Sequence, residues 1–173
     1  PGVAGVLDQM PALVDRAAWE SEGIVIPKIA VNVSSRRLDD PALGKKLRAL
    51  KIVPGTIAFE LLESISLDDC DDAVIANLRQ FRRLGIDIEI DDFGTGHTSI
   101  VSLLKLKPKR LKIDRQLVQP IMNSPQERAL VSSIIDIARS LGVETVAEGV
   151  ETAAHATLLD ELGCDLLQGY AFS

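Results

Sequence analysis

The hydrophobic pattern of the chain alternates between short strand-like runs and longer helical stretches. Six runs of five to seven residues are rich in Val, Ile, Leu and Phe: 29–34, 57–63, 86–92, 110–114, 145–150 and 166–170. Apolar residues at helical spacing occupy the segments between them. Because strands that alternate with helices pair side by side in the same direction, the pattern predicts an α/β fold with a parallel sheet.

The clearest helical segment runs from Pro125 to Leu141. Ser124 is a favourable N-cap residue, proline suits the first helical position, and Glu127 stands where a capping box requires an acidic residue. Gly142 follows the last apolar residue, where a glycine commonly ends a helix. The sequence therefore predicts a helix over residues 125–141.

A short motif of Leu, Gly, an apolar residue and an acid occurs three times. It occupies residues 84–87, 141–144 and 162–165, in each case directly before a predicted strand. The leucine is typical of the last buried residue of a helix, and the glycine is typical of the helix end. The repeat supports a succession of strand–helix units.

Polar residues gather at the carboxyl ends of all six predicted strands. In a barrel of parallel strands these ends form the face that carries the active site. Buried carboxylates are costly without partners, so a hydrogen bond or a solvated edge explains one such residue more readily than a whole series. The pattern indicates a functional site built from Asn32, Glu60, Glu63, Asp91, Asp92, Lys112, Asp114, Glu148, Glu151 and Gln168.

Composition limits the class of protein. The 173 residues, 46% hydrophobic and 25% charged, suffice for one globular domain with a sizeable core. A net charge of −6 argues against a protein that binds DNA through backbone electrostatics. Cys70 and Cys164 lie in no metal-binding spacing, and we expect two free thiols in a reducing cytoplasm, with a disulfide between them as the alternative. No signal peptide or apolar run long enough to span a membrane is visible.

Asp91 and Asp92 begin the most informative segment, which continues through Phe93 to Gly96. Adjacent carboxylates repel each other and stay ionised most readily beside a cation. Carboxylate oxygens suit a hard divalent cation such as Mg²⁺. The alternative interpretation is a strand that ends in an acidic turn, since Asp and Gly are also turn residues.

The ordered motifs resemble the EAL-domain family, the bacterial phosphodiesterases that hydrolyse cyclic di-GMP. Residues 91–96 match the family's Asp-Asp-Phe-Gly-Thr-Gly, 112–114 its Lys-Ile-Asp, and 147–151 its Ala-Glu-Gly-Val-Glu. Residues 32–34 are similar to its Asn-x-Ser, 60–63 to its Glu-x-Thr-Glu with Leu62 in place of Thr, and 168–170 to its Gln-Gly-Tyr. The resemblance covers nearly the whole chain.

The resemblance implies a TIM-like (β/α) barrel and hydrolysis of cyclic di-GMP to linear pGpG by water activated at two Mg²⁺ or Mn²⁺ ions. It assigns the metals to Asn32, Glu60, Asp91 and Asp92, catalysis to Lys112 and Glu148, and substrate binding to Gln168. We expect Glu63, Asp114 and Glu151 to support the metal ligands and the loop formed by Gly94, Thr95 and Gly96. A salt bridge between Lys112 and Asp114 is also compatible with the sequence.

The departures from the family matter for activity. The Glu-Ala-Leu motif, which supplies a further metal ligand, does not occur, and only about six of eight strand–helix units are visible. We expect a domain over residues 1–173 that lacks its N-terminal strands and its C-terminal end, as a fragment or a natural truncation. These residues should hydrolyse cyclic di-GMP poorly. The alternative function is an inactive receptor for cyclic di-GMP or a protein-interaction module.

The resemblance also suggests partners and surroundings. We expect a homodimer, fused regulatory domains such as GGDEF or PAS, no DNA binding, and a cytoplasmic location with the parent protein tethered to a membrane in some cases. Of the two histidines, His97 follows the glycine-rich segment, and we expect it to have a role in the loop or at the surface rather than to bind a metal. His155 lies early in the last predicted helix, where we expect it to be solvated.

Overall fold

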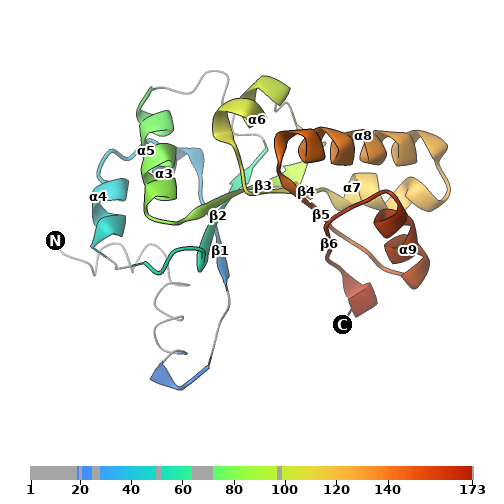
Figure 1. Cartoon of the computed structure of the whole chain (residues 1–173), viewed down its shortest axis with the longest axis horizontal. Helices are drawn as coiled ribbons and strands as arrows, with labels where there is room; N and C mark the ends of the chain where they lie inside the picture. The colour runs from blue at the N-terminus through green and yellow to red at the C-terminus, as the bar shows by residue number, and fades with distance from the viewer. Residues whose placement is uncertain are drawn as a thin grey trace. The chain divides into compact units, whose positions relative to one another are not determined.

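The computed structural model describes residues 19, 21–24, 28–49, 52–63, 72–96 and 99–172. Its six strands form one parallel sheet in the order β1-β2-β3-β4-β5-β6 (Figure 1). Strands that are neighbours in the sequence are thus neighbours in the sheet, which confirms the predicted α/β fold. The strands are β1 Ile29–Asn32, β2 Ile57–Leu62, β3 Asp87–Phe93, β4 Arg110–Ile113, β5 Glu144–Ala147 and β6 Leu166–Leu167.

Helices connect the strands at every step. The α-helices are α3 Ser35–Leu38, α4 Leu43–Arg48, α5 Asp72–Arg83, α6 Ile100–Leu106, α7 Arg115–Val118, α8 Pro125–Leu141 and α9 Ala153–Glu161. Two 3₁₀ helices are η1 Gln119–Met122 and η2 Tyr170–Phe172. The helix predicted over 125–141 is confirmed at both ends, whereas β5 and β6 end three residues before the predicted strand ends.

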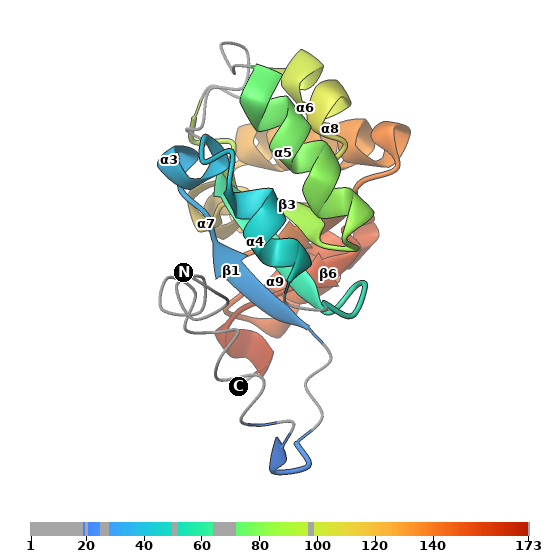
Figure 2. The ribbon, with the colours of Figure 1, turned by 90° about the vertical axis from the view of Figure 1, so that its left-hand side faces the viewer.

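The chain divides into two compact units, one of residues 1–61 and 69–88 and the other of residues 62–68 and 89–173. In the first unit α4 and α5 lie side by side (Figures 1 and 2). The end of the Gln80 side chain on α5 lies against Gly44 of α4, and a side chain at this position would have to displace it. Phe59 of β2 and Phe81 of α5 are fully buried, with their rings edge to face at 5.2 Å.

In the second unit α8 packs on α7, η1 and β5. Its buried face consists of Val131, Ile134, Ile135 and Ala138, which recur at helical spacing. The Ser124 hydroxyl occupies the N-cap position but donates to the Glu127 carboxylate and makes no bond to a backbone N–H. The predicted capping box is therefore formed only between the two side chains.

The repeated Leu-Gly-apolar-acid motif ends a helix in all three places. Its glycines have positive φ values: +76° at Gly85, +68° at Gly142 and +83° at Gly163. Residues with a side chain rarely adopt this conformation, which explains the glycine. The chain then turns from the helix into the next strand, as the sequence predicts.

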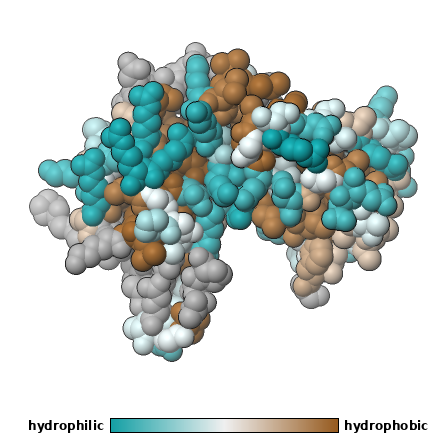
Figure 3. Space-filling view, in the orientation of Figure 1, coloured by the Kyte–Doolittle hydropathy of each residue, from teal (hydrophilic) through white to brown (hydrophobic). Residues whose placement is uncertain are grey.

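Exposed apolar side chains form one patch on α6. Ile100, Val101 and Leu104 are 52%, 55% and 53% exposed, and Figure 3 shows a hydrophobic patch over this helix. We call these three residues the α6 patch. Within the described ranges, no helix combines the length and the apolar character that a membrane crossing requires.

Candidate active site

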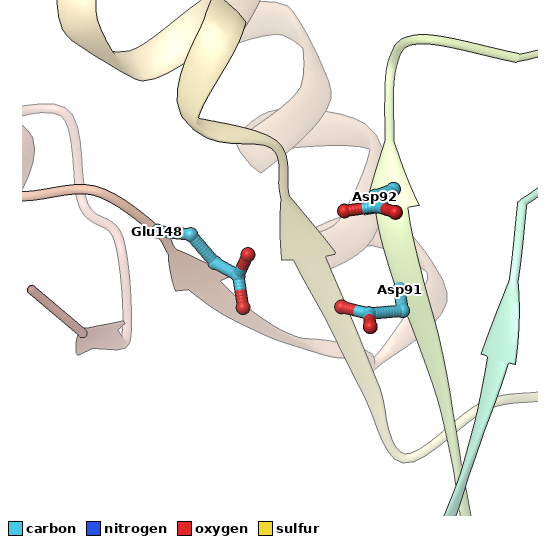
Figure 4. Close-up of side chains that lie close together, drawn as sticks. All are labelled: Asp91, Asp92 and Glu148. Carbon is cyan, nitrogen blue, oxygen red and sulfur yellow. The ribbon is translucent and has the colours of Figure 1, made fainter. Parts of the chain in front are cut away.

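Asp91 and Asp92 lie on an irregular stretch of β3. Ile90 of β3 pairs with Leu111 of β4, and the next pair is Phe93 with Ile113. Between these two pairs β3 therefore contains one residue more than β4. This extra residue is a β-bulge, and Asp92 adopts φ +56°, which is uncommon for a residue other than glycine. In a regular strand adjacent side chains point to opposite faces. Because of the bulge, both carboxylates turn toward Glu148 (Figure 4).

Lys112 lies between these acids on the neighbouring strand β4. Its Nζ atom is 2.8 Å from Oδ1 of Asp91 and 2.7 Å from Oε1 of Glu148. Glu148 follows the last residue of β5, and its backbone N–H donates to the carbonyl of Ile113 at 3.1 Å. The three charged side chains are only 11–19% exposed, so their attraction is less screened than at the surface.

Negative charge exceeds positive charge in this cluster. One oxygen from each of Asp91, Asp92 and Glu148 lies within 4.8 Å of the others. Burial raises the pKa of Asp92, and the charges of Asp91, Asp114 and Glu148 raise it further. Oδ1 of Asp91 is buried and is paired with the Lys112 ammonium, which both Asp91 and Glu148 share. A divalent cation would relieve this repulsion, and the all-oxygen donor set fits one.

Glu63 holds the loop that follows the two aspartates. Its Oε2 atom accepts the backbone N–H groups of Gly94 at 2.8 Å, Thr95 at 3.0 Å and Gly96 at 2.6 Å. The Thr95 hydroxyl donates to the backbone carbonyl of Asp92 at 3.0 Å. Gly94 has φ +104°, where a side chain would collide with Leu117. The buried carboxylate therefore fixes the loop in a conformation that needs glycine.

Other predicted residues have separate contacts. Asp114 caps α7 by accepting the N–H of Gln116 at 2.6 Å, and Glu151 accepts the Gln119 carboxamide at 2.8 Å. Gln168 has an exposed side chain, and its backbone N–H donates to the carbonyl of Ala147 at 2.9 Å. The described contact of Glu151 is therefore with η1, and its support of the glycine loop stays a prediction.

Asn32 and Glu60 belong to the first unit. They are directly paired at the carboxyl ends of β1 and β2. Glu60 is half-buried and Asn32 is exposed. The prediction that they bind the same metal as Asp91 stays a prediction.

His155 departs from its predicted environment. The side chain is only 8% exposed, and Nε2 lies 3.1 Å from the carbonyl oxygen of Gln119. The expectation of a solvated histidine was wrong because η1 packs against the start of α9. Cys164 is a free, buried thiol, while Cys70 and His97 lie outside the described residues.

Comparison with known proteins identifies the family. The model of the EAL domain matches residues 6–173. The chain belongs to the EAL domain family. Its open parallel sheet is accordingly part of the TIM-like barrel of EAL domains, as predicted.

Two bacterial relatives of the chain are named as cyclic di-GMP phosphodiesterases. It is 36% identical over 156 residues to the bifunctional diguanylate cyclase/cyclic di-GMP phosphodiesterase MucR of Pseudomonas aeruginosa, covering 88% of this chain and 23% of MucR. It is 34% identical over 161 residues to the cyclic di-GMP phosphodiesterase PdeR of Escherichia coli, covering 91% of this chain and 24% of PdeR. The chain thus spans about a quarter of the length of these relatives.

Solved EAL structures share the fold. The MucR phosphodiesterase in complex with cyclic di-GMP matches with a TM-score of 0.76 and 36% identity, over 84% of this chain and 60% of that one. The manganese and cyclic di-GMP complex of BlrP1 from Klebsiella pneumoniae matches with a TM-score of 0.72 and 30% identity, over 83% and 38%. These structures hold a dinucleotide and, in BlrP1, a divalent metal.

Proposed function

We propose that this EAL domain hydrolyses cyclic di-GMP to linear pGpG with Mg²⁺ or Mn²⁺ as cofactor. The observation that carries the proposal is the convergence of Asp91, Asp92 and Glu148 around Lys112. These residues lie on β3, on β4 and directly after β5, and they match the family's motifs. The names of MucR and PdeR support the same substrate and reaction.

Two divalent cations would be held by Asn32, Glu60, Asp91 and Asp92. This assignment agrees with the surplus of negative charge and with the raised pKa of Asp92. When bound, a pair of divalent cations lowers the pKa of water and neutralises the charge of the phosphate oxygens.

The chain's own residues then act on the substrate and on a proton. We propose that the Lys112 ammonium, which lies between two carboxylates, stabilises negative charge on a phosphate oxygen. Glu148 is proposed to accept the proton that the attacking water loses. Gln168 is exposed near the end of the sheet and is proposed to contact the dinucleotide.

The proposal is tested by incubating the protein with cyclic di-GMP and Mn²⁺ and separating the products by chromatography. Because the Glu-Ala-Leu motif does not occur in these residues, we expect pGpG to form slowly, and we expect none to form when the metal is chelated. Asp91→Asn should abolish turnover, whereas Asp136→Asn, which changes an exposed carboxylate of α8, should not. Binding of cyclic di-GMP without turnover would identify a receptor domain, and the absence of both would reject the proposal.

The wider setting of the domain is also proposed from its relatives. MucR is named as bifunctional, which supports further fused signalling domains. A second copy of the chain is proposed as the partner of the α6 patch, because three adjacent exposed apolar residues are typical of an interaction surface. Location in the cytoplasm follows from the bacterial second messenger that the domain is proposed to use.

A further inference from the structure

The loop after β5 carries Glu148 and is held against the segment after β4. Glu148 donates its N–H to the carbonyl of Ile113, the last residue of β4. Gly149 has φ +71°, and a Cβ atom there would lie 2.6 Å from Cβ of Arg115. The loop backbone therefore packs directly on the first turn of α7.

His155 and Gln119 add two further attachments beyond this point. The Gln119 carbonyl can only accept a hydrogen bond, so Nε2 of His155 carries the proton and donates at 3.1 Å. The Gln119 carboxamide donates to Glu151 at 2.8 Å. The backbone N–H of His155 in turn donates to the Thr152 hydroxyl at 3.1 Å, which fixes the first turn of α9.

These contacts join the segments that carry the two proposed catalytic side chains. Lys112 is on β4, and the chain continues from it through Asp114, the cap of α7, to Gln119. Glu148 leads through the loop to His155. A bond between Gln119 and His155 therefore limits how far Glu148 can move from Lys112, which it contacts at 2.7 Å.

We propose that His155 is a positioning residue that, through Gln119, holds Glu148 in place beside Lys112. This inference rests on the proposed function for its effect on catalysis. Nδ1 of His155 is buried and has no hydrogen-bond partner among the described residues. An unsatisfied buried nitrogen is a cost that a purely apolar packing residue would not carry. The hydrogen bond from Nε2 to the Gln119 carbonyl is what histidine provides here and an apolar residue does not.

The test compares His155→Leu, His155→Gln and Leu159→Ala. His155→Leu removes the donor, whereas the carboxamide in His155→Gln can donate to the same carbonyl. Leu159, fully buried on the same helix, is the control for a general loss of packing. Two measurements are made on each protein: hydrogen exchange of the Glu148 amide, and kcat and KM for cyclic di-GMP with Mn²⁺.

We expect His155→Leu to speed exchange of the Glu148 amide about tenfold, since the loop loses a hydrogen bond. It should lower kcat about tenfold or more with little change in KM, because a small displacement of Glu148 impairs catalysis more than binding. His155→Gln should restore both quantities, and Leu159→Ala should lower the melting temperature without reproducing the loss of kcat.

Unchanged exchange and unchanged kcat in His155→Leu would overturn the proposal, as would equal effects from Leu159→Ala. If His155→Leu does not fold, His155→Phe decides, because it keeps a ring at the buried position and removes the donor to the Gln119 carbonyl. It should also speed exchange of the Glu148 amide, and no change would again overturn the positioning role. If the wild-type protein proves inactive, the proposed function fails, while the exchange measurements still test the positioning role.

Discussion

Replacing Glu63 with alanine should release the loop of Gly94, Thr95 and Gly96. A hydrogen bond to a charged group contributes about 1.5–3 kcal/mol, and Glu63 accepts three. The contributions are not additive, because all three N–H groups share one oxygen. The three loop residues are also exposed, so water can replace the lost acceptor. We therefore expect Glu63→Ala to reduce the free energy of unfolding by about 2–3 kcal/mol.

Glu63→Gln separates the charge of this side chain from its shape. The carboxamide oxygen can still accept from the loop, so the loss should be only about 1 kcal/mol. Urea unfolding gives the free energies, hydrogen exchange of the loop amides gives the local effect, and Glu161→Gln on the exposed face of α9 is the control. If Glu63→Ala leaves both the unfolding free energy and the exchange of the loop amides unchanged, Glu63 does not hold the loop.

Three further predictions concern other parts of the molecule. Lys112→Ala should lower kcat more than it weakens binding of cyclic di-GMP, measured by turnover and titration, because its ammonium is placed at the proposed site of developing charge. Asp165→Asn should destabilise the protein by about 1 kcal/mol at pH 7. The pKa of Asp165 is lowered by the N–H of Thr145, so its contribution is complete above about pH 4 and is lost as the pH falls further; the difference between the unfolding curves of wild type and variant should shrink accordingly. Leu104→Glu in the α6 patch should favour monomers in light scattering, whereas Leu130→Glu, a change at a similarly exposed leucine of α8, should not.

Local signals predicted the regular parts of the fold well. The helix α8 begins and ends where its proline, acidic first turn and glycine place it, because these signals act on neighbouring residues. β5 is shorter than its apolar run indicates because Gly149 takes a positive φ and the chain leaves the sheet to pack on Arg115. That contact joins residues far apart in the sequence, and the apolar pattern of residues 145–150 contains no sign of it.

The geometry of the site was less predictable than its composition. The sequence indicated which strand ends carry acids, but the alternating pattern up to Ile90 gave no sign of the bulge at Asp91 and Asp92. A bulge depends on the pairing with β4 as well as on the strand that contains it. The burial of His155 likewise depends on η1, which begins 36 residues earlier. Both features arise from contacts between segments distant in the sequence.

Acidic residues also lie at the starts of strands. Their ion pairs with Lys and Arg distinguish them from the acids of the candidate site. Asp87 lies 2.8 Å from the Lys28 ammonium, and Glu144 contacts two cations, Lys109 and Arg110, which lower its pKa. At the opposite ends of the strands, the pKa of Asp92 is raised because the side chain is partly buried and lies near other carboxylates. Paired acids of the first kind stabilise the fold, whereas a cluster with surplus negative charge fits a divalent cation. The sequence shows both kinds as acids beside apolar runs, and only the folded arrangement of their partners separates structure from function.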